Sequence, residues 1–170
     1  YTRLTGRPVL PPKWAFLPWK WRDECKDGRF DTLYGLTVNA ELADDIKHYE
    51  KLDFPKGVYL IDRPWAKGTF GYGNFEWDPD RFPNGDRMVE LLKEHGWHVT
   101  VWGAPWAIGD KDWEQGPEAR EKGLIIGNRN LDYTNPEAVA WHKEKLEAFL
   151  ERSGVEGWKL DRGEEYIPSG

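Results

Sequence analysis

The sequence predicts an α/β protein in which short parallel strands alternate with helices. Within its 170 residues, four apolar runs alternate with three segments of helical periodicity, in the order β-α-β-α-β-α-β. The apolar runs are short and uniformly apolar, which is typical of parallel strands covered by helices. Long loops follow the strands and short turns follow the helices, so the loops are expected to gather on one side of a barrel or an open sheet. The pattern alone does not decide between barrel and open sheet.

The first expected elements follow a proline-rich lead-in. Residues 1–13 are punctuated by prolines and cannot pair as an interior strand. Residues 14–17 form the first expected strand, and a polar loop follows over residues 19–37. Asn39 can cap a helix over residues 40–52, because an asparagine side chain accepts hydrogen bonds from the first free amides of a helix.

The middle of the chain contains two strands separated by one helix. Residues 58–61 form the second expected strand, and a glycine-rich and aromatic-rich loop follows it. Its glycines lack the strand–turn–helix context of a dinucleotide-binding fingerprint. A helix is expected over residues 85–95 and ends at Gly96, and residues 97–102 form the third strand. Residues 106–133 are expected to form another long loop.

The last helix and strand have strong boundary signals. Asn135 and Pro136 provide a capping side chain and a proline at the first helical position. This helix stops at Gly154, and the fourth strand covers residues 155–161. All four strands and three helices are assigned to a single domain, residues 1–170.

Composition excludes several classes of function. The net charge is -6 and the 24 basic residues are scattered, which argues against binding to nucleic acid or to an anionic membrane surface. No apolar run is long enough to cross a bilayer. Cys25 is the only cysteine, so no internal disulfide can form. The four histidines lack metal-ligand spacing, and there is neither a nucleophile-elbow serine nor a phosphate-binding loop, so no metal or cofactor is expected.

Tryptophan is unusually abundant, with 11 residues in the chain. Aromatic rings outside a core often serve as flat platforms with a polar edge, which suits the C–H faces of sugars. The alternative is an aromatic-rich core. The platform interpretation is favoured for the tryptophans in polar, loop-like surroundings: Trp21, Trp65, Trp77, Trp106 and Trp113. The core interpretation is favoured for the others considered: Trp14, Trp97, Trp141 and Trp158.

Polar and aromatic residues stand at the ends of the expected strands. Lys159 and Asp161 are two residues apart and therefore lie on the same face of the fourth strand. They could form an ion pair that only ties the strand end together, or a functional site. Carboxylates, a lysine and aromatic residues together suit glycoside chemistry. The strand-end residues are Trp19, Asp62, Arg63, Trp102, Lys159 and Asp161.

Five stretches spread over nearly the whole chain carry a resemblance to a known family. They are Gly6-Arg7-Pro8 through Pro12 with Trp14, Trp77-Asp78-Pro79 with Phe82-Pro83-Asn84, Val101-Trp102 with Pro105, Tyr133-Thr134-Asn135-Pro136, and Lys159-Leu160-Asp161-Arg162-Gly163-Glu164. Each stretch alone is weak, but their joint order and spacing are specific. On these residues the chain resembles the catalytic barrel of glycoside hydrolase family 31, which contains retaining α-glucosidases and α-xylosidases.

The resemblance implies a role for each matching residue. Asp161 matches the catalytic nucleophile, and Lys159 matches a residue that approaches the sugar hydroxyls and keeps the nucleophile ionised. Asp62 matches the acid that holds a distal sugar hydroxyl, although it could also be a plain strand-end cap. Trp102 matches a tryptophan of the subsite wall. Three further residues are expected to contact the substrate: Trp19, Arg63 and Trp65.

The chain also departs from the family pattern. Arg63-Pro64-Trp65 stands where the α-glucosidases carry a second acid and an aromatic residue, so Arg63 could read an acidic or modified sugar. The resemblance implies that the chain is the first half of a (β/α)8 TIM barrel, with about four of its eight strands. The general acid would then lie beyond the chain. A non-catalytic sugar-binding half-barrel is the alternative, and a homo-oligomer or the second half-barrel is the expected protein partner.

Overall fold

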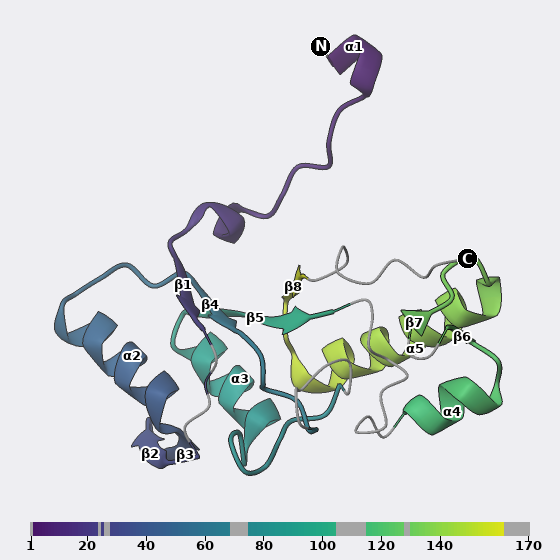
Figure 1. Cartoon of the computed structure of the whole chain (residues 1–170). Coiled ribbons are helices and arrows are strands. Elements are labelled where there is room, and N and C mark those ends of the chain that lie inside the picture. The colour runs from purple at the N-terminus through teal and green to yellow at the C-terminus, as the bar shows by residue number, and fades with distance from the viewer. Residues whose placement is uncertain are drawn as a thin grey trace.

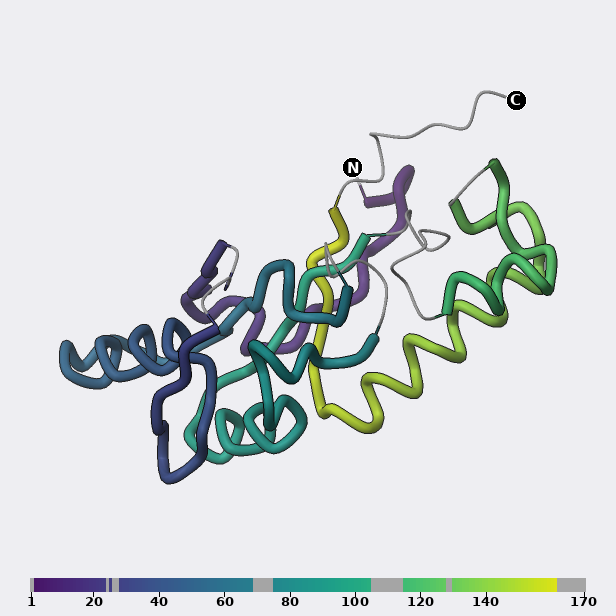
Figure 2. The backbone as a smooth tube through the Cα atoms, turned by 60° about the horizontal axis from the view of Figure 1, so that its bottom comes forward, coloured from purple at the N-terminus to yellow at the C-terminus, as the bar shows by residue number. Residues whose placement is uncertain are grey.

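The protein contains a four-stranded parallel sheet with helices on one face. The computed structural model describes residues 2–23, 25, 28–68, 75–104, 115–127 and 130–161. The strand order is β1-β4-β5-β8, and the bounds are Trp19–Arg22, Val58–Ile61, His98–Gly103 and Gly157–Leu160. Helices α2 (Ala40–Lys51), α3 (Gly85–Glu94) and α5 (Pro136–Ser153) connect successive strands. Because α3 lies between α2 and α5, the helices follow the order of the strands (Figure 1 and Figure 2). The predicted α/β class with parallel units is confirmed.

Shorter elements occupy the N-terminal arm and the loops. The arm, residues 2–12, is exposed and extends away from the sheet (Figure 1). The shorter elements are α1 (Thr2–Thr5), the 3-10 helix η1 (Lys13–Phe16), β2 (Phe30–Leu33), β3 (Leu36–Asn39), α4 (Gly116–Glu121), β6 (Ile125–Ile126) and β7 (Asn130–Leu131). Strands β2 and β3 form one antiparallel hairpin, and β6 and β7 form another.

The first strand was predicted in the wrong place. Residues 14–17 were expected to be a strand, but η1 begins after Pro12 and takes up most of them. Strand β1 instead begins at Trp19, in a segment that was expected to be a loop. The reason is that β1 lies at the edge of the sheet and alternates aromatic with basic residues, so the search for a uniformly apolar run missed it.

The expected long loops also contain secondary structure. The segment over residues 19–37 includes β2 and much of β3, which are joined by Tyr34 and Gly35 with φ of 50° and 84°. A two-residue turn with positive φ at both positions matches the twist of an antiparallel hairpin. The segment over residues 106–133 likewise contains α4, β6 and β7. Hairpins of two to four residues per strand are too short to produce a clear sequence period.

The predicted helix boundaries are confirmed by their capping contacts. The Asn39 side chain accepts hydrogen bonds from two amides in the first turn of α2, and Asn135 accepts one in the first turn of α5. Pro136 is the first residue of α5, and Gly154 ends this helix in the left-handed conformation with φ of 70°. Each cap satisfies backbone groups that the helix end leaves without intrahelical partners.

The sheet has a helix face and an open face, because successive residues of a strand point to opposite sides. On the helix face, Tyr59 reaches α2 and Trp158 packs on Phe149 of α5. On the open face, the ring of Trp14 from η1 stacks on His98 with the centroids 4.8 Å apart, so η1 covers the N-terminal end. The strand positions assigned to the open face are Trp19, Trp21, Val58, Leu60, Asp62, His98, Thr100, Trp102, Gly157, Lys159 and Asp161.

The helix face is covered by an aromatic core. The Trp65 ring lies 5.0 Å from Trp77 and 4.9 Å from Phe149, measured between centroids. The core interpretation is confirmed for Trp97 and Trp141, which are buried, and for Trp158, which packs against the core. The platform interpretation was wrong for Trp65 and Trp77, which are 2% and 7% exposed. Two other predicted platforms lie outside the described residues: Trp106 and Trp113.

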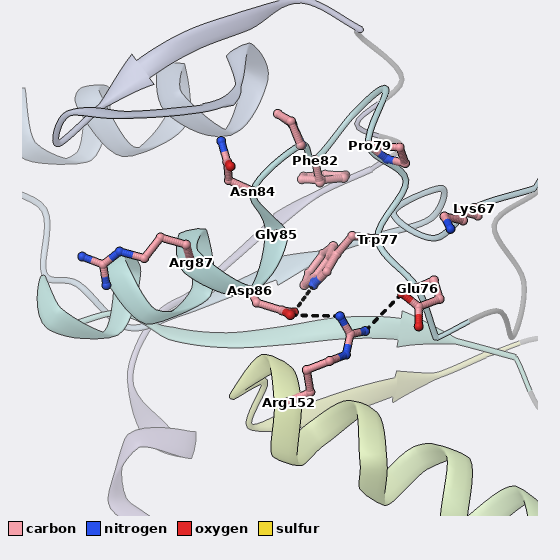
Figure 3. Close-up of a pocket in the computed structure, with 11 residues that line it drawn as sticks. Lys67, Glu76, Trp77, Pro79, Phe82, Asn84, Gly85, Asp86, Arg87 and Arg152 are labelled. Atoms are coloured by element: carbon pink, nitrogen blue, oxygen red, sulfur yellow. Dashed lines mark hydrogen bonds and ion pairs between the residues drawn. The ribbon is translucent and has the colours of Figure 1, made fainter.

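The loop after β4 is fastened to the helices at a surface pocket of about 390 Å³ (Figure 3). The indole Nε1 of Trp77 donates to Asp86 at 2.7 Å, and Arg152 of α5 donates to the other oxygen of Asp86 at 2.9 Å. Arg152 also lies 3.5 Å from Glu76 (Figure 3). Gly85 allows the Trp77 ring to approach, because a Cβ there would lie 2.2 Å from the ring. Since these charges satisfy one another, the pocket is a structural junction.

A second cavity, of about 350 Å³, places a histidine in mostly apolar surroundings that include Leu146 and Trp158. The His142 ring accepts or donates one hydrogen bond with the Tyr133 hydroxyl at 2.9 Å, and burial lowers the pKa of His142 to about 4. The unfolded chain therefore binds a proton between about pH 6.5 and pH 4 that the folded chain excludes, so stability should fall as the pH falls through this window.

We expect the free energy of unfolding to fall by roughly 1–3 kcal/mol between pH 7 and pH 4.5, because His142 is protonated in the unfolded chain and not in the folded one. The measurement is urea unfolding at both pH values, on the unmodified chain and on His142→Phe. Because phenylalanine does not titrate, the variant should lose less stability on acidification. An equal loss in both proteins would contradict the prediction.

The sheet has unpaired edges at β1 and β8 within the described part of the chain. Edge strands recruit further strands, and Trp19, Trp21 and Leu160 on them are about half exposed or more. We therefore retain the prediction that the chain self-associates through these strands, through a two-fold contact. Light scattering at micromolar concentration tests it. A monodisperse monomer of 19.9 kDa that unfolds cooperatively would contradict it.

No helix in the described ranges is long and apolar enough to cross a bilayer.

Candidate active site

Five side chains meet where the parallel strands end at their carboxyl side. Trp21 comes from β1, Trp102 from β5 and Lys159 from β8, while Asp62 and Asp161 directly follow β4 and β8. The parallel register brings these strand ends side by side at one edge of the sheet, on the open face. In parallel α/β folds this edge is where ligands bind.

Asp62 is a buried carboxylate with donors on both oxygens. Its Oδ2 accepts a hydrogen bond from Trp21 Nε1 at 2.5 Å and one from Lys159 Nζ at 2.9 Å. Its Oδ1 accepts from the backbone amide of Arg63 at 2.8 Å. The residue is 2% exposed, and these contacts offset the cost of burying a charge.

Asp161 is the more accessible of the two carboxylates, with 39% of its side chain exposed. Its Oδ2 accepts a hydrogen bond from Trp102 Nε1 at 3.0 Å and lies 3.2 Å from Lys159 Nζ. Its backbone amide donates to the carbonyl of Gly103 at 3.0 Å, which holds the residue at the strand end. Asp161 is therefore oriented by two side chains and still reaches solvent.

Lys159 bridges the two carboxylates. Burial alone would lower the pKa of its ammonium, but the hydrogen bonds with Asp62 and Asp161 outweigh burial and raise that pKa above the ordinary value. The ammonium also lies over the Trp21 ring, 5.0 Å from its centroid, where the ring's electrons attract a cation. Lys159 thus stays positively charged at neutral pH. The Lys159–Asp161 ion pair expected from spacing is present and extends to a second acid.

The other predicted substrate contacts lie elsewhere or are undecided. Trp19 was expected after the first strand, but it begins β1 at the opposite edge of the sheet and donates its indole N–H to Ala15. Trp65 is buried, and its Nε1 donates to the carbonyl of Trp102 at 2.8 Å, so its ring face is not available to a sugar. Arg63 is half-buried beside Asp62, and its role in substrate binding stays a prediction.

Trp21 is the site residue that the sequence did not assign. It was grouped with the tryptophans in polar surroundings, without a partner. The alternation of Trp19, Lys20, Trp21 and Arg22 was the available signal, because it places both tryptophans on one face and both basic residues on the other. The misplaced first strand concealed this signal.

The described ranges hold no group of three or more histidine, cysteine or acidic residues that could bind a metal ion.

Replacing Lys159 by methionine should move the acidic limb of the activity profile toward higher pH. A neighbouring ammonium favours the ionised form of a carboxylate, and methionine removes that charge while keeping a similar volume. The measurement is the pH dependence of reaction at Asp161. Lys145→Met is the matched control, because Lys145 pairs with Glu118 at 3.2 Å outside the site. An acidic limb unchanged by Lys159→Met would leave Lys159 as a packing residue.

Comparisons with known proteins place the chain and its fold in one family. The model of the glycosyl hydrolases family 31 TIM-barrel domain matches residues 8–169. Alpha-xylosidase XylQ of Lactiplantibacillus pentosus is 30% identical over 182 residues, which cover 96% of this chain and 22% of the relative. The sulfoquinovosidase of Escherichia coli strain K12 is 26% identical over 189 residues, which cover 99% of this chain and 26% of the relative.

Solved structures show the same fold. A GH31 dextranase of Flavobacterium johnsoniae, in complex with glucose, matches with a TM-score of 0.73 and 23% identity, covering 92% of this chain and 20% of the dextranase chain. The chain spans about a fifth to a quarter of the length of these relatives. Its four parallel strands and three connecting helices are consistent with half of a barrel. Because the family model covers nearly the whole chain, the protein belongs to glycoside hydrolase family 31.

Proposed function

We propose that the chain provides the nucleophile and the sugar-binding residues of a retaining α-glycosidase. The observation that carries the proposal is the position of Lys159, which bridges a solvent-accessible carboxylate, Asp161, and a buried one, Asp62. An accessible carboxylate that is held ionised and oriented can attack a carbon centre. A buried carboxylate with its donors in place can recognise a hydroxyl group.

In this mechanism, Asp161 attacks the anomeric carbon, and the bond from that carbon to the leaving oxygen breaks. The product of this step is a covalent glycosyl-aspartate, which water then hydrolyses with overall retention of configuration. Lys159 stabilises the ionised form of Asp161 before attack. Asp62 already accepts three hydrogen bonds, so it acts as an acceptor and does not donate a proton. The general acid would come from a segment outside this chain.

The sugar would be held by groups around Asp161. Asp62 would accept a hydrogen bond from a distal hydroxyl, and Lys159 would donate to another. Trp102 was expected to form a wall of the subsite, but it is 1% exposed, so it would act by orienting Asp161 through its indole N–H. Arg63, next to Asp62, would read an acidic or otherwise modified substituent. The matched relatives include an alpha-xylosidase, a sulfoquinovosidase and an alpha-glucosidase, so the substrate class is an α-glycoside and the sugar itself is open.

Covalent labelling tests the proposal directly. The chain is exposed to 5-fluoro-α-D-glucosyl fluoride or 5-fluoro-α-D-xylosyl fluoride, and intact mass and peptide mapping follow. Fluoride leaves without protonation, so labelling does not need the general acid. We expect a single adduct on Asp161. Labelling elsewhere, or no labelling by either reagent, would count against the nucleophile assignment.

The alternative is a non-catalytic sugar-binding half-barrel, since the same contacts can hold a sugar without reaction. Both functions predict that the sugar binds, and only the first predicts an adduct. A chain that binds methyl α-glycosides in calorimetry but is never labelled by the fluorides would favour the binding module.

A further inference from the structure

Trp21 contacts Asp62 and Lys159, which are two of the charged residues in the proposed sugar site. Its indole N–H donates to Asp62 Oδ2, and its ring lies beneath the ammonium of Lys159. Lys159 in turn donates to the same Oδ2 of Asp62. The three side chains, hereafter the Trp21 triad, therefore form a closed set in which each member contacts the other two. Trp21 is 51% exposed, so the burial of its ring does not account for its position.

Counting acceptor positions shows what Trp21 does to Asp62. An ionised carboxylate offers about four acceptor positions, two on each oxygen. Trp21 and Lys159 fill both positions of Oδ2, and the amide of Arg63 fills one of Oδ1. Within the described residues, one position of Asp62 therefore remains, on Oδ1. Without the indole N–H, a ligand hydroxyl could also approach Oδ2, and the carboxylate would bind it in more than one orientation.

The triad also restricts Lys159. A lysine side chain is a flexible four-carbon chain that ends in a compact charge. Two nearby carboxylates therefore do not by themselves fix the position of its ammonium group. The Trp21 ring adds a third attraction from a different direction, at 5.0 Å from the ring centroid. The ammonium is thereby held at a point from which it reaches Asp62 and Asp161 at once.

We propose that Trp21 is a positioning residue that leaves Asp62 a single acceptor position for one sugar hydroxyl and holds Lys159 between the two acids. The inference rests on the proposed function for its ligand, a neutral hydroxyl of an α-glycoside. The arrangement of the triad itself does not depend on any ligand. Loss of the indole N–H should weaken sugar binding more than it slows the reaction at Asp161.

The chain contains a matched control for this chemistry. Trp141 of α5 donates its indole N–H to Glu118 at 2.9 Å, and Lys145 lies over its ring at 5.5 Å and 3.2 Å from the same glutamate. This second indole–carboxylate–ammonium set joins α4 to α5, on different elements from the site. Trp141→Phe therefore removes the same kind of hydrogen bond without touching the Trp21 triad.

The first experiment needs no sugar. In ¹H–¹⁵N spectra of the full chain, Asp62→Asn should shift the indole signal of Trp21 upfield, because a neutral amide oxygen is a weaker acceptor than a carboxylate. The Trp141 indole signal should stay in place, and Glu118→Gln should shift it instead. A Trp21 signal that Asp62→Asn leaves unchanged would overturn the proposal.

The second experiment separates binding from reaction. The rate of labelling by the 5-fluoro-α-D-glycosyl fluorides is measured against reagent concentration for the unmodified chain, Trp21→Phe and Trp141→Phe. Trp21→Phe should raise the half-saturating concentration about tenfold and change the maximal rate less, in keeping with a lost hydrogen bond to a charged group. Trp141→Phe should change neither. A half-saturating concentration within about twofold of the unmodified chain for Trp21→Phe would overturn the proposal.

The two experiments distinguish this proposal from the function on which it rests. If the unmodified chain is never labelled, the proposed glycosidase function fails, and the spectra alone decide the role of Trp21. If the chain is labelled at Asp161 but Trp21→Phe behaves like Trp141→Phe, the glycosidase function stands and the role of Trp21 is refuted.

Discussion

Replacing Asp161 by alanine should abolish labelling by 5-fluoro-α-D-glycosyl fluorides and should lower any glycosidase turnover by about three orders of magnitude or more. The carboxylate is the only group assigned to form the covalent bond, and its loss cannot be offset by the groups that orient it. The loss should not unfold the chain, because Asp161 is 39% exposed and its ion pair with Lys159 is partly exposed.

The measurement compares labelling and hydrolysis of an aryl α-glycoside by the unmodified chain, alone or mixed with a complementing half-barrel, with the same assays on Asp161→Ala. Circular dichroism and cooperative unfolding check that the variant is folded. Azide could restore part of the rate by entering the vacated volume. Asp44→Ala, an exposed acid on α2, should leave both assays unchanged. If Asp161→Ala keeps more than roughly a tenth of the rate, a difference of only ~1.4 kcal/mol, the nucleophile assignment is wrong.

Replacing Asp45 by alanine should lower the free energy of unfolding by about 3–5 kcal/mol, the largest stability loss predicted for a single side chain. Asp45 of α2 is nearly buried, and it accepts hydrogen bonds from Arg22 at 2.5 and 2.6 Å and from the hydroxyl of Tyr59 at 2.8 Å. Lys20 lies 3.2 Å away. Burial would raise the pKa of Asp45, but the donors of Arg22 and Tyr59 and the charge of Lys20 lower it.

The loss is large because alanine removes the acceptor of the Tyr59 hydroxyl and the carboxylate that pairs with both Arg22 and Lys20. Tyr59 is fully buried, and Arg22 and Lys20 belong to the edge strand β1, which the ion pairs attach to α2. The measurement is urea unfolding at pH 7. The matched control is Asp31→Ala, which breaks an ion pair with Lys47 in which both side chains are about half exposed, and which should cost far less stability than Asp45→Ala. Similar losses in the two variants would show that Asp45 is not a structural centre.

The fold could be predicted wherever one physical signal dominated. Strand β4 is uniformly buried and β5 is buried after its first residue, so both can be recognised in the sequence as mainly apolar runs. The capping residues Asn39 and Asn135 mark their helices clearly. Strand β1 could not be found in this way, because two of its four residues are basic. Lys20 and Arg22 can point toward the helices only because Asp45 of α2 pairs with them. That contact is tertiary, and the local pattern does not contain it.

The site could be predicted at the positions that directly follow apolar strands. Asp62 and Asp161 lie where the strand ends place them, and Lys159 reaches both. The assignments that failed depend on the direction of a side chain. Trp65 turns into the core. Trp21 turns toward Asp62 because the first strand covers Trp19–Arg22 and not the apolar residues 14–17. Polarity of the neighbouring residues does not distinguish these two tryptophans.

The division of the sheet into a helix face and an open face has a consequence for laboratory evolution. Alternate positions of each strand belong to different faces, so a library at those open-face positions that reach solvent, such as Trp21, can vary ligand recognition while the residues that pack against the helices stay constant. Trp102 is the exception, because its indole holds Asp161 while its carbonyl accepts the indole N–H of Trp65 from the core. A substitution at Trp65 would therefore alter activity from a position that no sugar touches, and screens limited to ligand-facing positions would miss it.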